Sequence, residues 1–182
     1  MRKIKTYFNN AIIGNSRMLA CLSSKGEIVR LFWPNIDYFQ HVEKLIMGLY
    51  PVDRKHGTSW LGEDDWITCQ SYIDDSNVLK TSYSNDETGM DVDQFDLVLP
   101  GEGLGAGPDA GPGGDVLIRH YEIKNRGSEA KETGFIVYSS FTVSGQDIRG
   151  SLFDFDSEAL VHYRHGYYIS ISADRDVYQF QL

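Results

Sequence analysis

The side chains best suited to chemistry in this sequence are carboxylates, several of which stand close together. Hydrolysis of a glycosidic bond needs two carboxyl groups across the bond, one as acid and one as base or nucleophile. The candidates are Asp64, Asp65, Asp74, Asp75, Asp91, Asp93, Asp96, Asp154 and Asp156. Most fall in expected turns or on the polar positions of expected strands, where solvated acids normally lie. We therefore expect no catalytic pair, and no catalytic residue, in this chain.

Metal-ligating residue types also occur in pairs. Asp91 and Asp93 share one face of an expected strand, and so do His120 and Glu122. Calcium needs several oxygen ligands, and no loop of the EF-hand type is present. Zinc needs three or four converging ligands, which a single His-X-Glu pair on a strand does not supply. The sequence predicts no metal site and no cofactor.

The strongest candidate for ligand binding is the aromatic-rich block 31–38. Trp33 can stack on a sugar ring, while Asn35 and Asp37 can hydrogen-bond its hydroxyl groups, a combination that suits a carbohydrate pocket. A structural interpretation is simpler and is favoured by composition alone. In it Trp33 belongs to the core, Pro34 ends a strand and Asp37 caps a helix. Both interpretations stay open at this point.

The elements that would position these residues are mostly strands, because the dominant period of apolar residues is two. Tyr167, Ile169 and Ile171 alternate with polar or exposed positions, which is typical of an antiparallel sheet with one buried face. Strands are expected near residues 17–22, 27–33, 66–73, 77–83, 90–99, 116–124, 135–143, 159–164 and 167–171. About ten strands in this length predict an all-β fold, an antiparallel β-sandwich.

Two segments differ from this pattern. Residues 38–49 carry apolar side chains at helical spacing, so we expect one short helix there, preceded by Asp37 as a possible N-cap and ended by Pro51. Residues 100–115 are almost entirely Gly, Pro, Ala and acidic residues, and we expect a flexible Gly-rich loop. No Lys-Ser/Thr follows these glycines, which argues against a phosphate-binding loop.

Composition excludes several classes of partner. The chain has 182 residues and a net charge of −9, from 26 acidic and 17 basic residues. Such a surface repels nucleic acids and anionic membranes, so neither is an expected partner. Cys21 and Cys69 are too few for a disulfide framework. Because residues 1–7 lack a following apolar stretch, they are not a secretory signal, and we expect a cytoplasmic protein.

Two motifs near the start of the chain together resemble a known enzyme family. The first runs from Ile12 through Gly14, Asn15 and Met18 to Ala20. The second is a glycine hairpin at Gly26 followed by Trp33-Pro34 and Asp37. This order is similar to the opening of bacterial and archaeal family 15 glycoside hydrolases, the glucoamylase and glucodextranase group. The strong match covers about residues 7–50.

The resemblance implies a supersandwich-like domain packed on an (α/α)6 barrel that carries the catalytic glutamates of an inverting hydrolysis. Residues 1–182 would then be a single accessory β-sandwich domain, C-terminally truncated, of an exo-acting α-glucan hydrolase of the glucan 1,4-α-glucosidase type. Its partners would be the catalytic domain of the same parent protein and an α-glucan oligosaccharide. Trp33, Pro34, Asn35 and Asp37 would lie on the loop facing the barrel, either bordering the substrate pocket or forming the interdomain contact.

Two other classes of function remain as alternatives. A stand-alone carbohydrate-binding module would bind soluble glucans through Trp33. A small sugar-active β-sandwich enzyme, such as an epimerase, would use His120, Glu122 and His162. We also expect self-association, because a sandwich that lacks strands leaves open strand edges.

Overall fold

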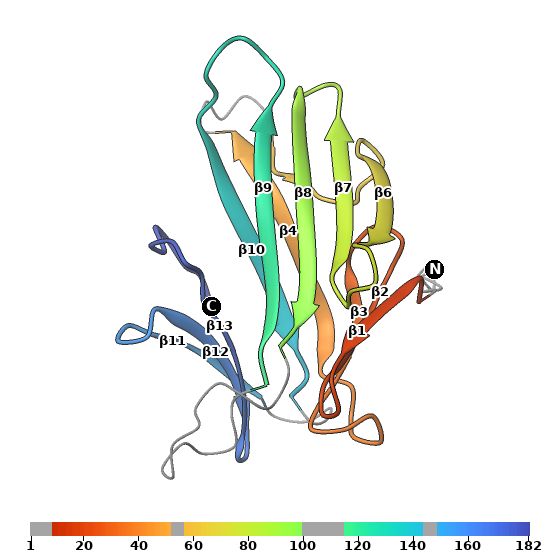
Figure 1. The fold of residues 1–182 in the computed structure, drawn as a ribbon. Coiled ribbons are helices and arrows are strands. Elements are labelled where there is room, and N and C mark those ends of the chain that lie inside the picture. Colours follow the sequence, from red (N-terminus) through yellow and green to blue (C-terminus); the bar gives the residue numbers. More distant parts are fainter. Residues whose placement is uncertain (1–8, 52–56, 100–114, 144–148) are drawn as a thin grey trace, which may run out of the picture.

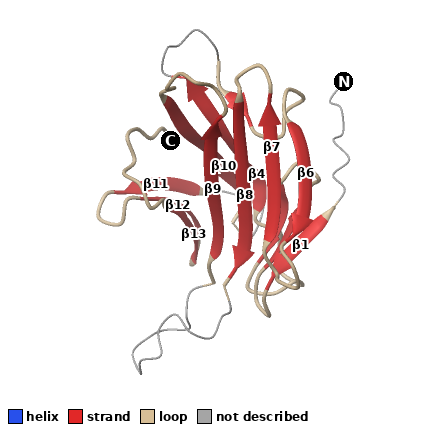
Figure 2. Ribbon diagram, turned by 45° about the horizontal axis from the view of Figure 1, so that its top comes forward, coloured by secondary structure: helices blue, strands red, loops and turns tan. Residues whose placement is uncertain are grey.

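The computed structural model describes residues 9–51, 57–99, 115–143 and 149–182. These residues form strands and loops without a helix (Figure 2). The Gly-rich loop expected at 100–115 lies outside the described residues apart from Asp115. Among the described residues, no helix has the length and apolarity to cross a membrane.

Thirteen strands occur within the described residues, more than the ten or so expected. They are β1 (Ala11–Gly14), β2 (Leu19–Leu22), β3 (Ile28–Phe32), β4 (Val42–Pro51), β5 (Ser59–Trp60), β6 (Ile67–Tyr72), β7 (Leu79–Asn85), β8 (Met90–Val98), β9 (Leu117–Asn125), β10 (Thr133–Phe141), β11 (Gly150–Asp154), β12 (Ala159–Arg164) and β13 (Tyr167–Ile171). Where the apolar period predicted a strand, most boundaries agree to within about two residues.

All pairings among these strands are antiparallel, in four sheets with the orders β1-β2-β3, β10-β4-β5, β6-β7-β8-β9 and β11-β12-β13. The sheet β6–β9 faces the sheet containing β4 and β10 (Figure 1). Along β8, buried and half-buried residues alternate strictly, which gives the sheet one inner and one outer face. The predicted all-β antiparallel sandwich is confirmed.

The core lies between these two sheets and extends to the other two. Buried residues from β1 to β4 cluster with Leu79 of β7, Val98 of β8 and Phe141 of β10. Tyr167 and Ile169 of β13 pack against this cluster. The sheet β11–β13 therefore covers one end of the shared core.

The short helix predicted for residues 38–49 is wrong, because this segment contains β4. The pairing of β4 with β10 shifts by one residue between Ser140 and Phe141, which leaves Glu43 as a bulge. A bulge adds one residue, so that Val42 and Leu45 lie on the same face although they are three positions apart. Beyond the bulge, Leu45, Met47 and Leu49 alternate as in any strand. The i, i+3 spacing that predicted a helix is thus produced by a bulged strand.

A buried polar network lies on the inner face of β8. The Arg119 guanidinium donates to both carboxylate oxygens of Asp96, from Nε at 2.5 Å and from Nη2 at 3.2 Å. Gln94 Nε2 donates to Asp96 Oδ2 at 2.6 Å and to the Gly26 carbonyl oxygen at 3.0 Å. Arg119 also donates to that carbonyl oxygen. The network attaches the β2–β3 turn to the sheet β6–β9.

Asp96 is completely buried. It therefore differs from most of the candidate carboxylates, which were expected to be solvated. Burial alone would lower the pKa of Arg119, but the adjacent Asp96 carboxylate outweighs burial and raises it. The role of the pair in the described structure is to connect β8, β9 and the Gly26 turn.

Candidate functional site

The aromatic-rich block singled out in the sequence forms a loop between β3 and β4, here called the 33–40 loop. Phe32 and Gln40 form an isolated antiparallel bridge at its base. The His41 amide donates to the Leu31 carbonyl oxygen at 2.8 Å, which closes the base a second time. The loop is thus held at both ends by backbone hydrogen bonds. The peptide bond between Trp33 and Pro34 is cis.

Trp33 is half-buried at the base of this loop, and its polar atom is engaged. The indole Nε1 donates to Asp115 Oδ2, which also lies 3.2 Å from Arg17 Nε. The Asp115 side chain is only 4% exposed. Its second oxygen, Oδ1, is buried and has no hydrogen-bond partner among the described residues. Because its N–H is committed to a buried carboxylate, Trp33 is fixed in orientation.

An aromatic cluster surrounds the indole. The Trp33 ring lies edge-on to Tyr167 at 6.3 Å and tilted to His41 at 6.4 Å, measured between ring centroids. Tyr38 stacks on His41 at 6.0 Å and also contacts Tyr167. Since Tyr167 begins β13, the cluster connects the 33–40 loop to the sheet β11–β13.

His41 is the buried centre of that cluster. Its Nε2 lies 2.7 Å from the Trp33 carbonyl oxygen, which can only accept, so Nε2 carries the proton. Burial is the main influence on the pKa of His41 and lowers it, although the hydrogen bond to Trp33 acts in the opposite direction. A neutral ring in this position supports the loop and is not exposed to a ligand, because His41 is fully buried.

The tip of the loop is exposed. The Asn35 side-chain oxygen accepts from the Asp37 amide at 3.0 Å, and the Asn35 carbonyl oxygen accepts from the Tyr38 amide at 3.2 Å. Asp37 caps no helix, because none follows it, and the helix cap expected there is wrong. Both side chains face solvent together with Ile36, which is 65% exposed, and Phe39, which is 61% exposed.

The structure does not assemble the other residue sets considered in the sequence. His120 and Glu122 lie 3.9 Å apart on the exposed outer face of β9. His162 is buried on β12, with Ser139 Oγ 2.9 Å from Nε2 and Ser151 Oγ 2.8 Å from Nδ1. Both of its nitrogens are therefore occupied, and it does not complete a site with His120 and Glu122.

The carboxylates of Asp91 and Asp93 are held in ion pairs and hydrogen bonds. Asp93 accepts from Ser82 and pairs with Lys80 and Lys124, while Asp91 pairs with Arg126. Within the described ranges, no group of three or more His, Cys, Asp or Glu residues is arranged to hold a metal ion.

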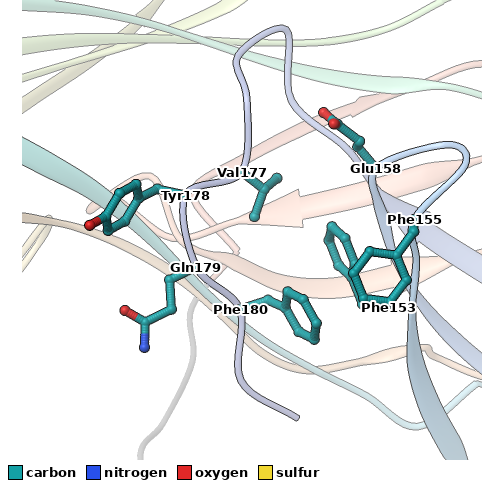
Figure 3. A pocket seen from close by; sticks show the side chains of 7 residues that line it. All are labelled: Phe153, Phe155, Glu158, Val177, Tyr178, Gln179 and Phe180. Atoms are coloured by element: carbon teal, nitrogen blue, oxygen red, sulfur yellow. The ribbon is translucent and has the colours of Figure 1, made fainter.

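A separate open pocket lies between β11 and the C-terminal stretch (Figure 3). Phe153 and Phe180 stack within it, with ring centroids 4.2 Å apart and planes 8° from parallel. Phe155 meets Phe180 nearly edge-on. The ring faces between Phe153 and Phe180 cover one another, so they are not available as a stacking platform for a ligand.

Three residues that support the 33–40 loop, either directly or through Asp115, were not identified from the sequence. Asp115 stands 82 positions from Trp33 and appeared only as the end of the Gly-rich stretch. His41 follows the block by a few residues and was placed within the expected helix. Arg17, which pairs with Asp115, lies inside the first of the two sequence motifs. Its place in that motif was the one indication in the sequence that it has a structural role.

Replacing Trp33 with phenylalanine is expected to lower the free energy of unfolding by about 1–3 kcal/mol, because the buried Asp115 carboxylate loses a donor. Urea unfolding followed by circular dichroism measures this loss. The same substitution in an Asp115→Ala background is the control, because no carboxylate is then left to lose a donor. A loss in that background as large as in the wild type would contradict the assigned role of Asp115.

The fold and the site together define an antiparallel β-sandwich domain. Its 33–40 loop has a base fixed by hydrogen bonds and ring contacts and a tip exposed to solvent. No protein-family model matches the chain, and no solved structure was found to match it. The chain is 26% identical over 174 residues to an uncharacterized glycosyl hydrolase of Methanocaldococcus jannaschii. The matched region covers 96% of this chain and 25% of that protein.

The chain thus spans about a quarter of the length of the curated relative that it matches. This similarity relates the chain to a glycosyl hydrolase. It agrees with the broader part of the resemblance seen in the sequence.

Proposed function

We propose that this chain is a non-catalytic accessory domain of an inverting, exo-acting α-glucan hydrolase of the glucoamylase type. In this proposal the tip of the 33–40 loop contacts the catalytic domain and borders its substrate pocket. The family assignment rests on the motif order from Ile12 to Asp37. The similarity to a glycosyl hydrolase supports the broader class.

The observation that carries the proposed role is the contrast between the base and the tip of the loop. The base is fixed by Asp115, His41 and Tyr167, whereas the tip exposes Ile36 and Phe39 to water. Exposed apolar side chains flanked by polar ones are typical of contact surfaces between proteins or domains. A rigid base keeps such a surface in one conformation, which lowers the entropic cost of docking.

The same contacts make a stand-alone carbohydrate-binding module the weaker candidate. A stacking tryptophan needs a free ring face and benefits from a free N–H. Trp33 is half-buried, donates to Asp115 and packs against two other rings. We therefore assign Trp33 to the support of the loop, with Asn35 and Asp37 as the residues that meet the partner domain or the sugar.

The reading frame downstream of residue 182 tests the class of parent protein. The proposal expects a long helical region with paired catalytic glutamates. An assay of the isolated chain on maltooligosaccharides tests the division of labour, and no glucose should be released. Clear glucose release by the isolated chain, or a reading frame without a helical catalytic region, would contradict the proposal.

In the parent protein, replacing both Ile36 and Phe39 with serine is expected to lower kcat/KM for maltooligosaccharides by about tenfold, because an apolar contact of the two domains is lost. The unfolding temperature of the isolated chain should stay unchanged, since both side chains are exposed. Ile67→Ser is the control, because Ile67 is 69% exposed on β6. An unaltered kcat/KM in the double variant would refute the interdomain contact.

A further inference from the structure

β9 and β10 are edge strands on the same side of the sandwich (Figure 1). One inner-facing apolar residue on each strand is far more exposed than the residue paired with it. Ile123 of β9 is 38% exposed, whereas its partner on β8, Val92, is completely buried. Val137 of β10 is 41% exposed, whereas its partner on β4, Met47, is 7% exposed. The space between the two sheets is therefore accessible at Ile123 and Val137, whereas Tyr121 of β9 closes it nearby by contacting Phe135 of β10, with ring centroids 4.8 Å apart.

The strand at the other end of the same sheet is covered by a different element. The Tyr72 hydroxyl of β6 accepts from the Ile12 amide at 3.0 Å and donates to the Ile12 carbonyl oxygen at 2.6 Å. Asn77 Nδ2 donates to the Gly14 carbonyl oxygen at 2.7 Å. These bonds place the β6 side of the sheet against β1. Uncovered edges are a common place for pairing with another chain, and among the described residues of this sheet the edge without a covering strand is at β9.

Two hydrogen bonds at the ends of the β8–β9 pairing show which backbone amides and carbonyls of β9 point away from β8. The Arg126 amide donates to the Gly89 carbonyl oxygen, and the Val116 carbonyl oxygen accepts from the Leu99 amide, both at 2.9 Å. The register of β8 and β9 is regular between these points. In an antiparallel ladder the residues facing a partner alternate. The even-numbered residues therefore face β8, and Tyr121, Ile123 and Asn125 direct their amides and carbonyls to the open edge.

This edge is complementary to itself in one register. With Ile123 opposite Ile123 of a second copy, the odd-numbered residues form the hydrogen-bonded pairs, and apolar Ile123 side chains meet on the inner face. On the outer face, Lys124 then stands opposite Glu122 of the second copy, and Glu122 opposite its Lys124. These positions are non-hydrogen-bonded pairs, in which side chains approach most closely.

The neighbouring symmetric registers are unfavourable for the same reason. Shifting the centre of symmetry by one residue places Glu122 opposite Glu122 or Lys124 opposite Lys124, and like charges directly opposite each other are destabilising. In the single chain, Lys124 is 3.7 Å from Glu122 and 3.4 Å from Asp93, and its side chain is 60% exposed. The charges that would select the register are therefore accessible at the edge.

We propose that this chain forms a two-fold symmetric dimer in which β9 pairs antiparallel with β9 of a second copy, centred on Ile123. The dimer extends the sheet β6–β9 across both copies and covers the open side of each core. This inference is independent of the proposed hydrolase role, because it rests on the edge geometry and charge pattern of β9.

Sedimentation velocity with charge-reversal variants tests the dimer and its register. The wild-type chain should dimerise at high micromolar concentration. Lys124→Glu and Glu122→Lys should each weaken the dimer by about tenfold, because each makes two opposed pairs alike in charge. The double variant that carries both changes should restore the wild-type dissociation constant. Arg30→Glu, which changes the net charge by the same amount as Lys124→Glu at an exposed position on β3, is the control for that variant.

Mixing the two single variants gives the sharpest outcome. Lys124→Glu makes the outer edge acidic and Glu122→Lys makes it basic, so an equimolar mixture should form a heterodimer more readily than either variant self-associates. Circular dichroism verifies that each variant is folded. A monomeric wild type at high concentration, or variants that all dimerise like the wild type, would overturn the proposal.

Discussion

Replacing Asp96 with alanine is expected to lower the free energy of unfolding by about 3–5 kcal/mol, because it leaves the Arg119 guanidinium buried without its counterion. Asp96 is 0% exposed, and the Arg119 side chain is 7% exposed. Water therefore cannot replace the lost carboxylate. Gln94, which donates to the same carboxylate at 2.6 Å, loses one of its two acceptors as well and keeps the Gly26 carbonyl oxygen. Urea unfolding followed by tyrosine fluorescence and circular dichroism measures the change.

Two further variants separate charge burial from general disruption of β8. Asp93→Ala removes a carboxylate from the outer face of the same strand, where Lys80 and Lys124 remain partly exposed, and a loss of less than about 1 kcal/mol is expected. Asp96→Leu combined with Arg119→Met replaces the ion pair by apolar groups and should recover most of the stability. A double variant as unstable as Asp96→Ala would contradict this account.

The second large effect is expected at Gly26, where alanine should lower the free energy of unfolding by about 2–4 kcal/mol. Gly26 has φ of +70°, a region in which L side chains are strained. An added Cβ would also collide with the Tyr83 hydroxyl oxygen and lie 3.1 Å from Gln94 Nε2. The Tyr83 hydroxyl oxygen lies 3.1 Å from Gln94 Oε1 and 3.0 Å from the Lys25 carbonyl oxygen, and Gln94 Nε2 donates to Asp96 and Gly26. Neither atom can therefore move aside without breaking hydrogen bonds.

Gly89→Ala is the matched control for the crowding. Gly89 has a similar φ of +64°, but an added Cβ would meet only the flexible Lys131 Nζ at 3.4 Å. The free energy of unfolding that Gly89→Ala loses should therefore reflect backbone strain alone, about 1–2 kcal/mol. Equal losses at Gly26 and Gly89 in chemical unfolding would show that the network does not hold the turn.

Most of the strand content followed from the period of apolar residues, since a sheet with one buried face requires alternation. The segment 38–49 was predicted incorrectly because the bulge at Glu43 changes the phase of that alternation. A bulge is stabilised by the partner strand β10, which lies about ninety positions further along the chain. Periodicity within one segment cannot distinguish such a strand from a helix.

The candidate site was located by residue type but not by contacts. Trp33, Asn35 and Asp37 stood out because aromatic and polar residues adjoin in the sequence. Whether Trp33 is exposed or engaged depended on Asp115, which precedes β9, and on Tyr167 of β13. The burial of Asp96 likewise depended on Arg119, because a carboxylate is tolerated in a core only beside a counterion.

By itself, the sequence determined the strand class of this protein, its acidic surface, the absence of a recognisable catalytic motif and the two motifs around Gly14 and Trp33. These are local properties, set by residue type and spacing. The tertiary structure alone decided that residues 42–51 form a strand, that the indole of Trp33 serves the fold and that β9 is the edge strand of its sheet. Each of these depends on which distant strands come together, because burial and hydrogen-bond partners arise only when the sheets have packed.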